Sequence, residues 1–309
     1  MPMKLTILGS NSALPTSERF PSAHVLNVHE RIYLIDCGEG TQMQLRKNRI
    51  RFGKLNHIFI SHLHGDHIFG LYGLLSTFNL MGRTSKVHLY APENYRNILY
   101  SHLTDFDINL NFEIDFIPLS GNDPIKVFED KYLTVTSFPL EHRVPSFGFL
   151  FREKPYDRNI IKECISTYKI PTVRIPAIKK GEDFITADGE IIRNEDITLP
   201  GPESLSYAYC SDTKYFKGLS GFVHGVNLLY HEATFDQSLT DLATITGHST
   251  TLDAARTASE ARVGKLIIGH FSARYKDIAP LVEEARSLFP QSFAAIDGHT
   301  YDAGNNSVP

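Results

Sequence analysis

The stretch SHLHGDH at residues 61–67 constrains this chain most, because it follows the apolar run HIFI at 57–60. Three histidines and one aspartate stand within these seven residues, and both residue types bind metal ions. A short apolar run of this kind predicts a buried strand, so the four groups would lie at a strand end. A fold that accepts this loop has to bring further metal ligands to the same place.

The spacing inside the loop predicts two metal positions. Side chains two residues apart in an extended segment project to the same side, so His62 and His64 can reach one metal ion. Asp66 and His67 fall where the chain turns into an apolar helix, and they face elsewhere. A catalytic zinc site also needs further protein ligands and a position for water. We therefore expect more ligands at other strand ends.

Three isolated residues further along the chain meet this requirement. His142 in PLEHR, Asp212 in YCSDT and His270 in LIIGHFS each come directly after a β-like run. Together with the loop they make seven candidate ligands, whereas a structural zinc closes its shell with four. The sequence therefore predicts a catalytic metal centre rather than a structural one.

Strand-like runs alternate with helical patterns along most of the chain. We expect strands at 4–10, 24–30 and 31–38, the last two forming a hairpin, and then a helix at 39–48. A later helix should run from Thr250 to Arg262 with Ser249 as its N-cap. Other expected elements are strands near 56–60, 86–92, 112–118, 132–138 and 147–151 and within 204–213, 227–234, 265–270 and 292–297, and helices near 68–81, 93–103 and 278–289. This pattern predicts an α/β fold of sheets covered by helices, with 1–309 forming one domain.

Residues 152–178 interrupt this pattern. They lose clear periodicity and include prolines, which favours an insertion that projects from the domain. The segment is basic at Lys162, Lys169 and Arg174, and a second basic run, RKNRIRFGK, occupies 46–54. Either run could bind nucleic acid or simply form a solvated face.

Bulk composition restricts the setting. A net charge of −4 argues against indiscriminate binding of phosphates. The first residues, MPMKLTILGS, are too short an apolar stretch for a secretion signal, and no apolar run of about 18 residues occurs. The three cysteines are odd in number and widely spaced, which suits reduced thiols. We expect a cytoplasmic protein that does not enter a membrane.

The order of these motifs resembles the metallo-β-lactamase superfamily and, within it, is most similar to the ribonuclease Z family. Enzymes of that family are endonucleases that trim the 3′ trailer from precursor tRNA. The shared stretches are DCGEGTQMQ (36–44), SHLHGDH (61–67), SDT (211–213), HEATF (231–235), GHSTT (247–251) and FSARY (271–275).

The resemblance implies a fold, a metal centre and partners. The fold would be an αβ/βα sandwich, in which two facing β-sheets carry helices outside and two zinc ions at one end. Residues 152–178 would be an arm that grips the tRNA body, often from the partner subunit of a homodimer. Mn²⁺ or another divalent ion could replace zinc. By the resemblance, one zinc is held by His62, His64 and His142, the other by Asp66, His67 and His270, and Asp212 bridges them.

The chemistry expected of this centre is hydrolysis of a phosphodiester. Paired zinc ions lower the pKa of a shared water, and Asp66 can orient that water and accept its proton. We predict that His248, which the resemblance pairs with Glu232, donates a proton to the leaving 3′ oxygen, although His248 could instead cap the helix. The products would be a tRNA with a 3′-hydroxyl and a trailer with a 5′-phosphate.

The chain departs from the family at two places. The family's Pro-x-Lys-x-Arg-Asn loop, which helps to choose the cleavage point, reads PTSERF here, with Ser17 and Phe20 at changed positions. The arm also lacks the frequent Gly-Pro pair in KIPTVRIPAIKKG at 169–181. Two other functions therefore stay open: a hydrolase of another phosphodiester and a non-catalytic RNA-binding protein.

Overall fold

The computed structural model describes residues 3–304 and divides them into two compact units. The larger unit contains both ends of the described chain. The smaller unit consists of Lys131–Leu133 and Glu153–Ser204. Between residues 3 and 304, every helix is too short or too polar to span a bilayer.

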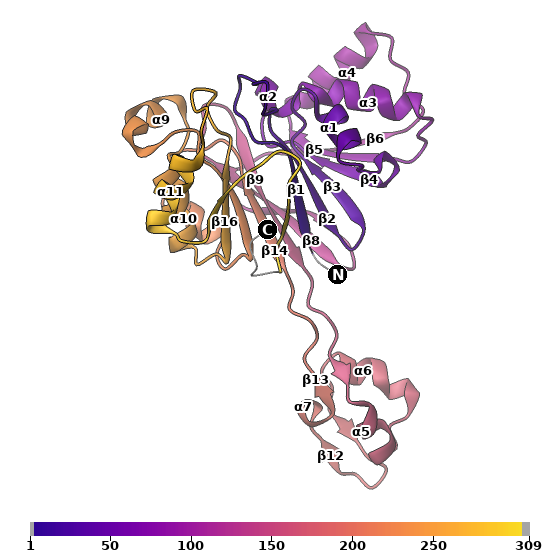
Figure 1. Ribbon diagram of the computed structural model, residues 1–309. Helices are drawn as coiled ribbons and strands as arrows, with labels where there is room; N and C mark the ends of the chain where they lie inside the picture. The colour runs from indigo at the N-terminus through magenta and orange to yellow at the C-terminus, as the bar shows by residue number, and fades with distance from the viewer. Residues whose placement is uncertain (1–2, 305–309) are drawn as a thin grey trace. The chain divides into compact units, whose positions relative to one another are not determined.

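A seven-stranded sheet of the larger unit uses the strands before residue 120 and the last described strand (Figure 1). The neighbouring pairs β18–β1, β1–β2 and β2–β3 are antiparallel, and the pairs β3–β4, β4–β5 and β5–β6 are parallel. The expected β2–β3 hairpin is confirmed; its two turn residues, His29 and Glu30, have φ values of 51° and 63°, as a type I′ turn requires. The order across the sheet is β18 (Thr300–Asp302), β1 (Lys4–Gly9), β2 (Ala23–Val28), β3 (Arg31–Ile35), β4 (Leu55–Phe59), β5 (Val87–Pro92) and β6 (Ile114–Leu119).

Helices cover one face of this sheet (Figure 1). Alternate strand residues such as Leu34, Ile58 and Leu89 point to that face and pack in one buried cluster with Leu74 and Phe78 of α3. The predicted helices at 39–48 and 93–103 are confirmed. The helical elements here are α1 (Thr41–Lys47), η1 (Phe52–Lys54), α2 (Gly65–Ile68), α3 (Gly70–Leu80) and α4 (Tyr95–Asp105).

A second seven-stranded sheet is built from later strands. β14 to β17 are parallel, while β9 runs antiparallel to β14 and β7 antiparallel to β8. Its order is β17 (Ser292–Ala294), β16 (Lys265–Gly269), β15 (Leu228–Glu232), β14 (Ser206–Cys210), β9 (Ser146–Glu153), β8 (Leu133–Leu140) and β7 (Ile125–Glu129). Its helical elements are α8 (Leu219–Phe222), η3 (Gln237–Leu239), α9 (Thr240–Thr246), α10 (Thr251–Glu260) and α11 (Ala279–Leu288).

The two sheets face each other through aromatic side chains. The Phe59 ring of the first sheet lies 5.3 Å from Phe149 and 5.2 Å from Phe151 of the second sheet. The opposite face of the second sheet packs on helices, because Ala254 of α10 and Leu281 of α11 share a buried cluster with its strands. The layers are thus helix, sheet, sheet and helix, which confirms the predicted αβ/βα sandwich.

One expected helix start was wrong by one residue. Thr250, not Ser249, is the N-cap of α10: its hydroxyl accepts from the backbone N–H of Asp253, whose carboxylate accepts from the N–H of Thr250. The Ser249 hydroxyl instead donates to the carbonyl of Thr213, 2.7 Å away. Strands β7 and β18 and helix α9 were not expected from the sequence.

The smaller unit has a core of its own. Asn194 is buried inside it, and its amide donates to the carbonyls of Ile178 and Glu182 at 2.6 and 2.7 Å. The unit runs to Ser204, well beyond the 152–178 expected for an inserted arm. Five buried residues form its core: Ile170, Ile178, Phe184, Ile192 and Ile197. Its elements are β10 (Asn159–Ile160), α5 (Lys162–Thr167), η2 (Thr172–Arg174), α6 (Ile175–Lys179), β11 (Phe184–Ile185), β12 (Ile191–Ile192), α7 (Asn194–Ile197) and β13 (Thr198–Leu199).

Candidate metal centre

The structure brings all seven predicted metal ligands together, although they come from both sheets. Those of the first sheet lie in the loop after β4 or in α2, and those of the second follow β8, β14 and β16. The ends of strands in a sandwich meet at one edge, so the loops that follow them can share a site. The members are His62, His64, Asp66, His67, His142, Asp212 and His270.

A first cluster joins three histidines and one carboxylate. The Nδ1 atom of His64 lies 3.0 Å from Nε2 of His62 and 3.2 Å from Nε2 of His142. The Oδ2 atom of Asp212 lies 3.5 Å from Nε2 of His62 and 3.8 Å from that of His142. Four ligand atoms of the nitrogen and oxygen type therefore converge on one point.

A second cluster is formed by Asp66, His67 and His270. The two histidine Nε2 atoms lie 3.3 Å apart, and Oδ2 of Asp66 is 3.4 Å from that of His67 and 3.3 Å from that of His270. His270 has a φ of 60°, a left-handed conformation that is uncommon outside glycine and that places its ring. This cluster can also hold a metal ion.

Asp212 faces both clusters at once. Its Oδ2 atom approaches the first cluster, while its Oδ1 atom lies 3.3 Å from Nε2 of His67 and of His270. The side chain is 3% exposed, and Oδ1 makes no hydrogen bond although it is buried. A buried carboxylate oxygen without a partner is costly unless a cation compensates it. The donor set therefore fits two metal ions that share one carboxylate.

His142 and His270, the two ligand histidines in loops of the second sheet, also form a hydrogen bond with the ring nitrogen that does not face the metal clusters. His142 Nδ1–H donates to the carbonyl of Gly247 at 2.6 Å, and His270 Nδ1–H donates to the Thr234 hydroxyl at 2.8 Å. A donor at Nδ1 leaves the Nε2 lone pair for a metal, so these contacts fix the tautomer that coordination requires.

Asp36 has the same role in the first sheet. Its carboxylate accepts from His67 Nδ1 at 2.7 Å and from the Ser61 hydroxyl at 2.8 Å, and that hydroxyl in turn accepts from His62 Nδ1 at 3.1 Å. The Tyr209 hydroxyl donates to it as well, at 2.6 Å. The φ of Asp36 is 54°, a rare conformation for a residue other than glycine. No role was assigned to Asp36 from the sequence; its place at the end of the strand at 31–38 was the available signal.

The charged surroundings shift the pKa values of these groups. Burial lowers the pKa of His67, but the carboxylates of Asp212, Asp66 and Asp36 outweigh it and raise that pKa well above its usual range. Burial raises the pKa of Asp66, but attraction and hydrogen bonds from His67 and His270 bring it below its usual range. Such strongly perturbed groups gather at functional sites.

Glu232 and His248 form a second polar pair beside the metal clusters. His248 Nδ1 lies 2.9 Å from Oε1 of Glu232. Glu232 is fully buried and also accepts from the backbone N–H groups of Thr213, Thr234 and Ser249 and from the Thr234 hydroxyl. Burial lowers the pKa of His248, but the carboxylates of Glu232 and Asp212 outweigh burial and raise it to about 9. A protonated His248 can therefore donate from Nε2 while Nδ1 is held.

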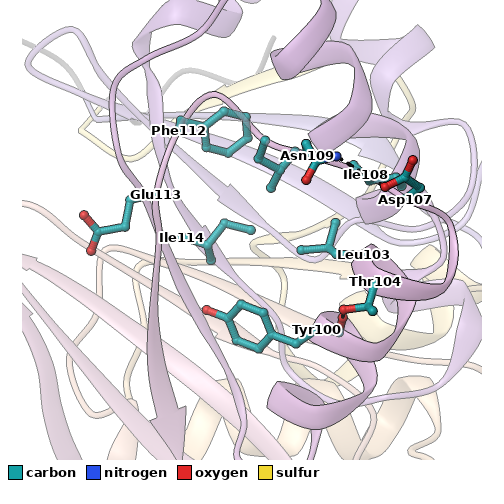
Figure 2. Close-up of a pocket in the computed structure, with 10 residues that line it drawn as sticks. Tyr100, Leu103, Thr104, Asp107, Ile108, Asn109, Phe112, Glu113 and Ile114 are labelled. Carbon is teal, nitrogen blue, oxygen red and sulfur yellow. Dashed lines mark hydrogen bonds between the residues drawn. The ribbon is translucent and has the colours of Figure 1, made fainter.

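These groups line an open cavity of about 410 Å³, where the side chains of His64, Asp66, Asp212, His248 and His270 meet. A larger cavity of about 550 Å³ lies at α4 and the start of β6, and Figure 2 shows its lining. That lining includes two carboxylates, Asp107 and Glu113, but no histidine. The smaller cavity is therefore the candidate active site.

The altered loop near the start of the chain lies beside this cavity. Ser12 and Ala13 belong to the cavity lining. Arg19 is held by the protein itself, because its Nε donates to Oδ1 of Asn11 at 3.0 Å and its Nη2 to the carbonyl of Tyr275 at 2.7 Å. Arg19, which stands at the position of the family's arginine, therefore stabilises the loop through these two hydrogen bonds.

Comparisons with known proteins agree with this geometry. A protein of Bacteroides fragilis named Ribonuclease Z is 46% identical over 292 residues, which cover 94% of this chain and 96% of the relative. The chain belongs to the ribonuclease Z family. A Ribonuclease Z of Porphyromonas gingivalis is 44% identical over 289 residues, covering 94% of this chain and 95% of that protein.

Solved structures place the fold in the same family. Human tRNase Z, short form, has a TM-score of 0.71 and 26% identity, and the match covers 97% of this chain and 98% of that one. The metallo-β-lactamase fold protein YhfI of Bacillus subtilis has a TM-score of 0.69 and covers 98% of this chain and all of its own, but at 18% identity it supports the fold alone. Residues 3–161 also match the family model described as "Anti-Pycsar protein Apyc1", so over this half the chain belongs to that family as well as to the ribonuclease Z family.

Proposed function

We propose that this chain is a zinc-dependent endoribonuclease that removes the 3′ trailer from precursor tRNA. The cut leaves a 3′-hydroxyl on the tRNA and a 5′-phosphate on the trailer. The observation that carries the proposal is the position of Asp212, whose two carboxylate oxygens face two separate clusters of histidine nitrogens. This is the arrangement that a two-metal phosphodiesterase needs.

Two zinc ions would be held by the clusters already described. His62, His64 and His142 would bind one ion, and Asp212 would bridge to the other. Asp66, His67 and His270 would bind that second ion. The mixed imidazole and carboxylate donors suit Zn²⁺ and also accept Mn²⁺. Bound metals would supply Lewis-acid activation of water and of the phosphodiester.

We propose that Asp66 handles the proton of the attacking water. It lines the cavity, and its Oδ2 atom is held by contacts to His67 and His270. The low pKa of Asp66 keeps the group ionised at neutral pH, so it can accept a hydrogen bond from water and fix the water's orientation. We assign Asp66 this orienting role and propose, as expected from the sequence, that it also accepts the proton, although a carboxylate of low pKa is a weak base.

We propose that His248 protonates the leaving 3′ oxygen. Its ring lines the cavity and its side chain is 13% exposed, so Nε2 is open to a substrate while Nδ1 stays on Glu232. Glu232 keeps the imidazole oriented and favours its charged form. The alternative role as a helix cap is not needed, because Thr250 caps α10.

The smaller unit, including the predicted arm at 152–178, is proposed to bind the body of the tRNA. Lys162, Lys169 and Arg174 are exposed on it, although Arg174 Nη2 also lies 3.6 Å from Oε2 of Glu182. By the same family resemblance we propose a homodimer that works in the cytoplasm. Light scattering of the purified protein tests the dimer, and a monomer at micromolar concentration would contradict it.

A cleavage assay on precursor tRNA tests the proposed function. We expect one cut at the 3′ end of the tRNA body, inhibition by a chelator and recovery with Zn²⁺ or Mn²⁺. Sequencing of both products checks the position and the terminal groups. Hydrolysis of small phosphodiesters without any cut in precursor tRNA would favour a phosphodiesterase for another substrate. RNA binding without any hydrolysis by metal-loaded protein would favour a non-catalytic protein.

A further inference from the structure

Two arginines line the metal cavity without a role in the chemistry above. Arg143 and Arg274 are both exposed and both belong to the cavity lining. Neither guanidinium forms an ion pair with any carboxylate in residues 3–304. Asp66 and Asp212 would be occupied as metal ligands, so a phosphate that lies beside the metals would meet Arg143 and Arg274 as cationic side chains of the lining.

Arg274 is held in a defined orientation. Its guanidinium lies over the Phe235 ring at 5.0 Å, and its Nε donates to the Ser272 hydroxyl at 3.1 Å. This leaves the two terminal nitrogens free to donate in parallel, the geometry that matches a phosphate. The Phe235 ring also meets the His248 ring edge-on at 6.2 Å, so Arg274 is tied to the proton donor through one aromatic side chain.

The Arg143 side chain lies against Gly247, the residue before His248. A Cβ atom on Gly247 would stand 3.4 Å from Cγ of Arg143 and 2.9 Å from Nδ1 of His142. Gly247 also has a φ of 81°, so a glycine both permits the turn and lets the Arg143 side chain pass close to the backbone before His248. Arg274 therefore reaches His248 through the Phe235 ring, and Arg143 lies beside the residue that precedes His248.

The proposed function fixes which part of the substrate lies there. The leaving 3′ oxygen belongs to the last nucleotide of the tRNA, and the next charge on that side is the phosphate on the 5′ side of this nucleotide. We propose that Arg143 and Arg274 bind that phosphate and so hold the leaving nucleotide beside His248. This inference rests on the proposed endonuclease function and adds two specificity-determining residues to it.

The first test compares substrates with and without a flanking phosphate. Arg143→Gln and Arg274→Gln should each lower kcat/KM on precursor tRNA by about tenfold, as expected for a lost charge-assisted hydrogen bond. Activity on bis(p-nitrophenyl) phosphate, which has no flanking phosphate, should be unchanged, and lysine at either position should restore part of the loss. Arg256→Gln is the matched control, because Arg256 also lies over an aromatic ring, 5.2 Å from Tyr215, but outside the cavity lining.

The second test neutralises the phosphate itself. One methylphosphonate on the 5′ side of the leaving nucleotide of a precursor tRNA should lower kcat/KM by about tenfold or more with the unmodified enzyme. It should cause no further fall in kcat/KM with the double Arg→Gln variant. A methylphosphonate on the 3′ side of the scissile position should affect both enzymes equally. If the 5′ methylphosphonate costs the double variant as much as the unmodified enzyme, the assignment is wrong. An unmodified enzyme that does not cut precursor tRNA would instead overturn the proposed function.

Discussion

Around the metal clusters two buried carboxylates, Asp36 and Glu232, each hold two histidines, whereas the smaller unit is held by a core of five apolar residues. Asp36 reaches His67 directly and His62 through a serine, and Glu232 reaches His248 directly and His270 through a threonine. The smaller unit instead leaves apolar side chains in solvent, such as Val173 at 82% exposure. The candidate site depends on fixed polar atoms, whereas the unit that we propose to recognise the RNA body has a separate, small core.

The largest expected effect comes from the bridging carboxylate. Asp212→Ala should abolish activity on precursor tRNA and on a small phosphodiester alike, because both clusters lose a charged ligand. Metal content should fall together with activity, and mass spectrometry of the metals in the purified variant measures it. Asp36→Asn, which removes only an orienting partner, should lower metal affinity by roughly 10- to 100-fold. A fully metal-loaded Asp212→Ala protein would contradict the bridging role.

The next effect separates proton transfer from metal binding within the centre. His248→Ala should lower kcat on precursor tRNA by roughly 10² to 10⁴, the usual contribution of a general acid. The kcat on a nitrophenyl phosphodiester should fall much less, because nitrophenolate leaves without a proton. Metal content and the affinity for tRNA should stay close to those of the unmodified enzyme. Equal losses on both substrates would rule out the proton-donor role.

A smaller effect should come from changes in the smaller unit. Replacing Lys162, Lys169 and Arg174 by glutamine should weaken binding of precursor tRNA and reduce the slope of log affinity against log salt by roughly 0.7 to 0.9 for each lost phosphate contact. Hydrolysis of a small phosphodiester should be unaffected. The control keeps the charge, with arginine at 162 and 169 and lysine at 174. Loss of activity on both substrates would mean that the smaller unit supports the metal centre.

The smallest effect concerns stability and pH in the larger unit. Burial lowers the pKa of His24, which lies between the sheets, to about 3. The unfolded chain binds a proton there below about pH 6.5 while the folded chain does not, so stability is present above that pH and is lost as pH falls. The loss should be about 2 kcal/mol between pH 6.5 and 5, and smaller in a His24→Gln variant. Denaturant unfolding of metal-free protein measures it, and equal pH dependence in both proteins would contradict this origin.

The sequence was informative where chemistry and strand ends coincide. The loop at 61–67 follows an apolar strand, and the candidates His142, Asp212 and His270 each follow another. Strands that share a sheet end at shared edges, so isolated polar residues after apolar runs can be grouped from the sequence alone. The sandwich followed from the alternation of strands and helices together with the resemblance.

The remaining features depend on contacts that no local pattern records. Asp36 holds His67 and Ser61 through pairings that span 31 and 25 residues, and its place at a strand end does not say which groups it holds. Strand β18 has only three residues and pairs with β1 from the opposite end of the chain. The smaller unit has elements of two to six residues, which are too short to show a period. Ser249 and Thr250 are adjacent hydroxyl residues, and only their contacts in the fold show which of them is the N-cap.

The order of the ligands along the chain has a consequence for biosynthesis. The loop at 61–67 emerges from the ribosome early, but His248 and His270 are made only after most of the second sheet. An unfinished chain can therefore present the first histidines without completing the proposed centre. A nuclease built in this order cannot complete the proposed centre before His270 has been made.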